Sequence, residues 1–131
     1  MRTMKEIMTE GIVSKASLLF IANLFRMPFT DWKAYKLGVI DQKGNIIKKP
    51  STKEEKNAVD GITNIIRKVK KILVKYIGDS KILNFLIAGY ILKNESTEQT
   101  NDIILEINSQ LSIDEQNQLE HLLYEINISS I

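Results

Sequence analysis

The chain lacks cysteine, and it has a single histidine, His121, among its 131 residues. The absence of cysteine excludes a disulfide scaffold, a thiolate metal site and a cysteine nucleophile. One histidine excludes a metal site built from several histidines of one chain, and the spacing around His121 offers it no second strong ligand. We therefore expect an exposed helical histidine, no metal and no cofactor.

Long apolar runs are also missing. The two longest, at residues 18–25 and 82–92, are each interrupted by an asparagine. Both are far shorter than the roughly 20 residues of a membrane-spanning helix. No small-residue cleavage site follows the N-terminal apolar run, as a secretory signal would require. We expect a soluble protein without a membrane partner.

The charge is divided unevenly along a chain of ordinary globular composition, 44% hydrophobic and 26% charged. Residues 1–93 hold all 18 lysines and arginines and eight acidic residues, whereas residues 94–131 hold the other eight acidic residues and no lysine or arginine. This predicts a basic helical module (1–93) and an acidic C-terminal helical hairpin (94–131). Two interpretations stay open: the acidic segment folds onto a basic module, its own or a neighbour's, or the two segments serve different partners.

Apolar spacing of three and four residues predicts a mainly α-helical protein of four to five helices. The clearest segments are 4–26, 52–77, 82–93 and the C-terminal hairpin, with a short helix between Thr30 and Gly38. One small β-hairpin is expected near residues 39–48, where two β-prone runs flank a polar turn. The expected core consists of Leu19, Phe20, Phe25, Trp32, Leu37, Ile65, Ile66, Val69, Leu73, Phe85, Leu86 and Tyr90.

Five cations lie within nine residues of the expected helix 52–77. They are Arg67, Lys68, Lys70, Lys71 and Lys75. Such a face can neutralise phosphates and bind nucleic acid without sequence preference. The alternatives are a solvated helix face or a docking surface for the acidic segment. No aromatic residue interleaves with these cations, so stacking on single strands is not expected.

A second group of residues consists of candidate partner-binding side chains. They are Leu18 and Phe20 in the first apolar run, Trp32 and Tyr35 on the short helix, and Leu119 and Leu123 on the C-terminal stripe. Aromatic anchors dominate interface energetics, but one aromatic face packed on the core, with the lysines pointing outward, is the simpler explanation of Trp32 and Tyr35 and the one we favour. Asp114, Glu115 and Glu120 are interpreted as a solvated face, and Gly44-Asn45 as a turn that binds no phosphate. We expect neither enzymatic activity nor a small-molecule substrate.

Two neighbouring strings resemble a known family. WKAYKLGVID at residues 32–41, followed by Gly44-Asn45, and KPSTKEEKNA at residues 49–58 resemble small proteins of T4-like tailed bacteriophages, in which such a block precedes a capped, lysine-rich helix. The resemblance covers about residues 24–93 and implies a virion component or assembly factor, found in the virion or the host cytoplasm. It carries no catalytic residues, and the acidic segment after Lys93 departs from it.

The first hypothesis is a non-enzymatic phage structural or assembly protein that contacts other virion subunits or a second copy of itself. A head-to-tail contact between unlike surfaces would build rings or larger lattices. The second hypothesis is a nucleic-acid-binding accessory protein that uses the basic face of helix 52–77. A third is a small regulator of a host enzyme, because an acidic lobe can mimic nucleic acid.

Overall fold

A computed structural model describes residues 14–92 and 98–129, and it confirms a mainly α-helical protein. The elements, in chain order, are α2 (Lys15–Arg26), the 3₁₀ turn η1 (Phe29–Asp31), α3 (Lys33–Lys36), α4 (Lys53–Ala58), α5 (Gly61–Leu73), α6 (Asp79–Ile87), the π-helical turn η2 (Ala88–Leu92), α7 (Glu98–Ser109) and α8 (Ile113–Ser129). Of the expected first helix, residues 4–13 lie outside the described residues. None of the helices in the described ranges is long and apolar enough to cross a membrane.

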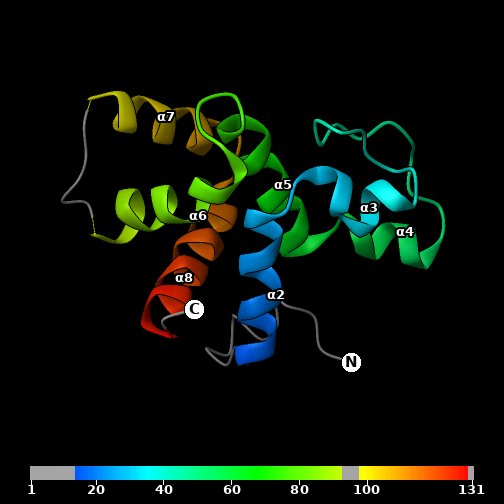
Figure 1. Cartoon of the computed structure of the whole chain (residues 1–131), viewed down its shortest axis with the longest axis horizontal. Helices are drawn as coiled ribbons and strands as arrows, with labels where there is room; N and C mark the ends of the chain where they lie inside the picture. The colour runs from blue at the N-terminus through cyan, green and yellow to red at the C-terminus, as the bar shows by residue number, and fades with distance from the viewer. Residues whose placement is uncertain (1–13, 93–97, 130–131) are drawn as a thin grey trace.

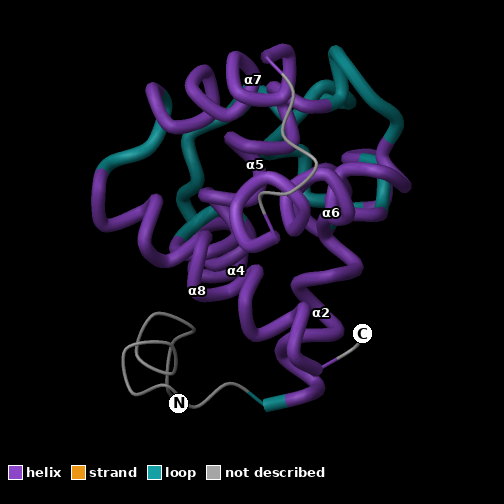
Figure 2. The backbone as a smooth tube through the Cα atoms, turned by 90° about the vertical axis from the view of Figure 1, so that its left-hand side faces the viewer, coloured by secondary structure: helices purple, strands orange, loops and turns teal. Residues whose placement is uncertain are grey.

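The β-hairpin prediction is wrong: residues 14–92 and 98–129 contain no strand, only one bridge between Ile40 and Ile46. The segment is a tight turn instead, and Figure 2 draws no strand in the described part of the chain. Asp41 Oδ1 accepts hydrogen bonds from the backbone N–H groups of Lys43 and Asn45, each at 2.9 Å. The N–H of Val39 donates to the carbonyl of Ala34 in α3. No third strand is present here to stabilise a ladder, and an isolated two-stranded hairpin is marginal in water.

The expected helix 52–77 is two helices. A capping box begins α4: Thr52 Oγ1 accepts from the N–H of Glu55, and the Glu55 carboxylate accepts from the N–H of Thr52. The chain then breaks before α5, where Gly61 has a φ of +55°. Only glycine adopts that conformation at little cost. The break lets α5 begin in a new direction, with Ile62 and Ile65 buried.

Most of the expected core is confirmed, with a correction in α2. Leu19 and Phe20 are 49% and 55% exposed, whereas Ile21 and Phe25 are fully buried. The apolar run covers nearly every side of this helix, so sequence spacing did not separate its inner face from its outer face. Leu37 and Phe85 are half-buried against the core rather than inside it.

The acidic hairpin packs on the basic module of its own chain (Figure 1). Buried Ile103 and Ile107 of α7 and Leu119 and Leu122 of α8 belong to the same hydrophobic cluster as α2, α5 and α6. Tyr76, just after α5, donates a hydrogen bond of 2.8 Å to Glu106 Oε2 in α7. The two oppositely charged segments therefore share one core.

Candidate interaction site

Two of the five cations expected to bind nucleic acid are buried inside the fold. Lys70 Nζ donates to the carbonyls of Phe25 (3.0 Å) and Met27 at the end of α2, and it pairs with Asp79 at 2.8 Å. A cation at the carboxyl end of a helix satisfies carbonyls that lack an intrahelical partner. Burial lowers the pKa of Lys70, although Asp79 opposes that shift. Lys70 is thus an internal structural residue.

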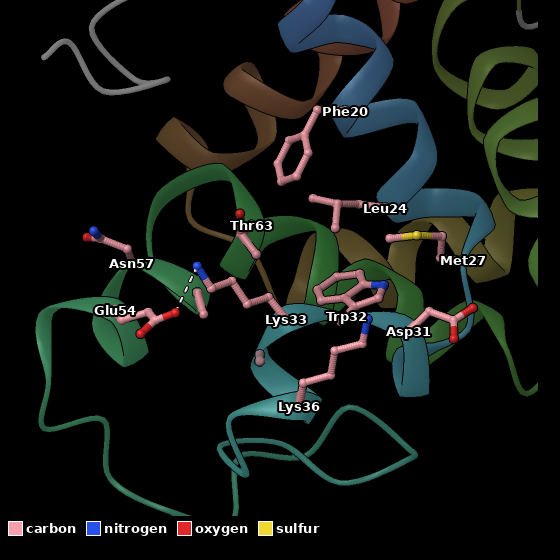
Figure 3. A pocket seen from close by; sticks show the side chains of 12 residues that line it. Phe20, Leu24, Met27, Asp31, Trp32, Lys33, Lys36, Glu54, Asn57 and Thr63 are labelled. Carbon is pink, nitrogen blue, oxygen red and sulfur yellow. Dashed lines mark ion pairs between the residues drawn. The ribbon is translucent and has the colours of Figure 1, made fainter.

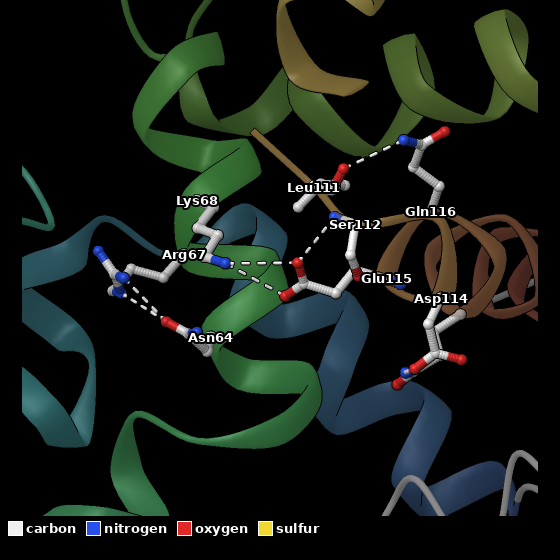
Figure 4. Close-up of polar contacts among 9 residues, drawn as sticks. Asn64, Arg67, Lys68, Leu111, Ser112, Asp114, Glu115 and Gln116 are labelled. Carbon is white, nitrogen blue, oxygen red and sulfur yellow. Dashed lines mark hydrogen bonds and ion pairs between the residues drawn. The ribbon is translucent and has the colours of Figure 1, made fainter. Parts of the chain in front are cut away.

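Arg67 is the second buried cation. Its Nη1 donates to the carbonyl of Gly44 at 3.0 Å, and its Nε and Nη2 donate to Asn64 Oδ1 at 3.2 and 2.8 Å (Figure 4). Burial lowers the pKa of Arg67. These contacts hold the 41–45 turn on α5, so the guanidinium is not available to a phosphate.

The remaining three cations face the acidic hairpin. Lys68 pairs with Glu115 Oε2 at 3.2 Å (Figure 4). Half-buried Lys71 and exposed Lys75 line a shallow pocket of about 260 Å³ together with Glu106 of α7. The prediction that all five cations form one exposed phosphate-binding face is therefore wrong, because tertiary contacts separate them.

Of the predicted partner-binding residues, some are buried in the core and others are exposed. Leu18, Trp32, Leu119 and Leu123 are each at most 3% exposed, so they are core residues and not partner surfaces. Trp32 packs on Phe29, with ring centroids 4.9 Å apart. Phe20 and Tyr35 remain on the surface, at 55% and 39% exposure.

Phe20 lies at a pocket of about 530 Å³ between α2, α3, α4 and the start of α5 (Figure 3). Apolar side chains from several elements line it: Phe20, Leu24, Met27, Trp32, Ala34 and Ala58. Charged side chains of α3 and α4 also line it, and Lys33 pairs with Glu54 there at 3.0 Å. An apolar pocket with a few polar groups is the usual form of a binding site.

The indole of Trp32 adds a polar group to this pocket. Its Nε1–H is buried, and it has no hydrogen-bond partner among the residues that the structure describes. Buried indole N–H groups usually find an acceptor. Figure 3 shows Nε1 on the side of the ring that faces Met27.

A set of exposed lysines that sequence reasoning missed, which we call the basic surface, lies on α3, α4 and the loop between them, and two of its members line the pocket. It consists of Lys33, Lys36, Lys43, Lys48, Lys49, Lys53 and Lys56. Lys48 pairs with Glu55 at 2.6 Å, and this contact helps to lower the Glu55 pKa to about 2. Besides Lys33 and Lys48, the lysines of this surface form no ion pair within residues 14–92 and 98–129. The high density of lysine between residues 33 and 56 was the sequence feature that could have predicted this basic surface.

His121 lies in a shallow pocket with Glu120 and Tyr124, and its Nε2 is 3.8 Å from Glu125 Oε1. It is half-buried rather than exposed, which corrects the sequence expectation.

Burial and the nearby Glu120 carboxylate raise the pKa of Tyr90 to about 12. Across the described ranges, no three histidine or acidic side chains gather in a way that could hold a metal ion.

Comparison of the chain with family models, with curated proteins and with solved structures gives no significant match.

Proposed function

We propose that this chain is a non-enzymatic structural or assembly protein of a tailed bacteriophage, acting through protein–protein contacts. The observation that carries the proposal is the pocket beside Phe20. An aromatic side chain more than half exposed stands at an apolar pocket of about 530 Å³. Aromatic anchors and the pockets they border are the usual centres of protein interfaces.

The nature of the lining favours a polypeptide partner. Six apolar residues supply contact area, and ionic groups of α3 and α4 stand beside them. Protein interfaces combine an apolar centre with a polar rim in this way. The phage context comes from the resemblance of residues 32–41 and 49–58 and is part of the proposal.

A phage that carries a tagged copy of the gene tests this function. We expect the chain in gradient-purified virions or in incomplete particles, detected by mass spectrometry. Phe20→Ser should lower its recovery with particles and the phage titre. Leu19→Ser is the matched control, because Leu19 is similarly exposed on the same helix but does not line the pocket. Normal particles from a phage without the gene would contradict the proposal.

Nucleic-acid binding remains the second candidate, favoured by the exposed lysines of the basic surface. These lysines are not the five cations at residues 67–75 that were expected to bind nucleic acid, of which Arg67 and Lys70 are buried. Charge reversal of Lys53 and Lys56 should then weaken binding to a DNA or RNA duplex and reduce its salt dependence. Lys81→Glu, at an exposed position on α6, is the control. Unchanged affinity would remove this candidate.

A further inference from the structure

The outward face of α7 carries one apolar side chain among acidic ones. Glu98, Asp102 and Leu105 are exposed, and Leu105 is 66% exposed. Residues spaced by three and four lie on one side of a helix. On the opposite side, Ile103 and Ile107 are buried in the core. The fold therefore holds α7 rigidly and leaves a leucine with flanking carboxylates unpartnered on the surface.

This acidic face and the pocket lie at different ends of the molecule. Figure 1 shows α7 at one end of the long axis, and α3 and α4 at the other. No residue of α7 or α8 lines the pocket beside Phe20. Because α7 is fixed by its buried side chains, it cannot reach the pocket of its own chain. A contact between the two surfaces has to join two molecules.

We infer that a second copy of this chain occupies the pocket: the α7 face of one copy docks beside Phe20 of the next, head to tail. Leu105 enters the apolar pocket, and Asp102 and Glu98 lie against the exposed lysines of α3. The contact rests on the proposed function for its role in assembly, but self-association is testable without a phage.

Charge complementarity selects a second copy as the occupant. Residues 94–131 carry eight carboxylates and no lysine or arginine. The basic surface beside the pocket has seven exposed lysines. The charged side chains that line the pocket itself are Lys33, which pairs with Glu54, and Lys36 and Asp31, so Lys36 is the lining lysine left to meet a carboxylate of the partner. Complementary potentials of this kind orient partners and speed their association. Since the two joined surfaces are different, each copy keeps one free surface, and repeated contacts form a ring or a filament.

Two blocking variants and their mixture test the geometry. Leu105→Glu should abolish the α7 surface, and Phe20→Glu should abolish the pocket surface, so each purified variant should be a monomer. Their mixture should form a dimer and nothing larger, because one intact surface of each kind remains. Ile128→Glu and Leu19→Glu are the controls, at exposed apolar positions on α8 and α2 that lie outside the pocket. Both controls should assemble like the unmodified chain.

The measurements are mass by light scattering and the fluorescence of Trp32, the only tryptophan, which lines the pocket. The full-length chain should gain mass with concentration, lose it at high salt, and change its emission in parallel. Circular dichroism checks that the variants fold. Lys36→Glu and Asp102→Lys should each weaken assembly, and copies carrying both substitutions should regain it.

Several results would overturn the inference. A monomer at the highest attainable concentration in low salt excludes self-association. Assembly of Leu105→Glu or Phe20→Glu alone, or no dimer on mixing, excludes this head-to-tail contact. Assembly that disappears after nuclease treatment assigns the basic surface to nucleic acid instead. A monomer that is still recovered with phage particles would leave the proposed function standing and remove only the self-contact.

Discussion

The cations of α5 and the lysines of the basic surface belong to one basic segment of sequence, yet they have opposite roles. Arg67 and Lys70 are buried and donate to backbone carbonyls of other elements. Lys36 and Lys53 are exposed and pair with no acidic group of the described residues. The density of positive charge along a sequence therefore does not measure the positive charge presented to a partner.

The difference follows from what each element packs against. Lys70 lies under the last carbonyls of α2 and beside the first turn of α6, which supply acceptors and a carboxylate. It also lies 5.5 Å from the centre of the Phe29 ring. No helix of the described residues covers the exposed lysines of α3 and α4. Lys70 is therefore buried because neighbouring helix ends cover it and supply its hydrogen-bond acceptors.

Lys70→Met should cause the largest loss of stability, because it removes the buried cation. Methionine keeps the apolar stem but leaves the carbonyls of Phe25 and Met27 and the carboxylate of Asp79 without their donor. Asp79 is 36% exposed and keeps part of its hydration, so the main loss is at the two carbonyls, at about 1 to 3 kcal/mol each in the free energy of unfolding. Lys71→Met, on the adjacent half-buried lysine, should cost less than about 1 kcal/mol. Urea unfolding followed by circular dichroism gives both values, and equal losses would contradict the internal role of Lys70.

Much of the helical fold was predictable, because periodic apolar residues mark a buried face. Ile65, Ile66, Val69 and Leu73 are buried as their spacing indicates. The same spacing rule placed Lys70 on the polar side of its helix, because the rule considers each helix without its neighbours. Lys70 contacts the end of α2 because of how two helices that are distant in the sequence cross. A local sequence pattern cannot predict that crossing.

Gly44→Ala tests the turn that the buried Arg67 holds on α5. Gly44 has a φ of +84°, and a Cβ there would lie 2.5 Å from the Phe29 ring. That ring packs on Trp32 and so has little room to move. Strain and overpacking together should cost about 2 to 4 kcal/mol.

Gly38→Ala is the control for this turn. Its φ is +76°, but nothing lies within 4 Å of an added Cβ, so only strain of about 1 kcal/mol is expected. Thermal unfolding of both variants measures the difference. If the two variants melt together, the close approach of Gly44 to Phe29 is not important for stability.

The interaction site was predictable only in part. Phe20 and Trp32 were each expected both in the core and on a partner surface; Phe20 is exposed, whereas Trp32 is a buried wall of the pocket. The pocket itself joins residues from α2 to α5, and the break before Gly61 that orients α5 interrupts an otherwise continuous helical pattern. Side chains brought together by such a break share no spacing in the sequence.

Glu115→Gln gives the smallest expected change and tests the contact between the acidic hairpin and α5. Burial raises the pKa of Glu115, but the N–H of Ser112 and the ammonium of Lys68 outweigh it and hold the pKa below the ordinary 4.5. A lowered carboxylate pKa stabilises the fold fully above the unfolded value, and this contribution is lost as the pH falls through the folded value. Glutamine can still accept from Ser112, so only the charge is removed.

The variant should therefore be about 0.5 to 1 kcal/mol less stable near neutral pH, the range of a partly exposed ion pair. The deficit should disappear in acid, where Glu115 itself is protonated. Urea unfolding at both pH values measures it, with Glu120→Gln, at an exposed position on α8, as the control. A deficit that persists unchanged in acid would mean that Glu115 acts through packing or capping, and that the ion pair with Lys68 does not help to hold the hairpin on α5.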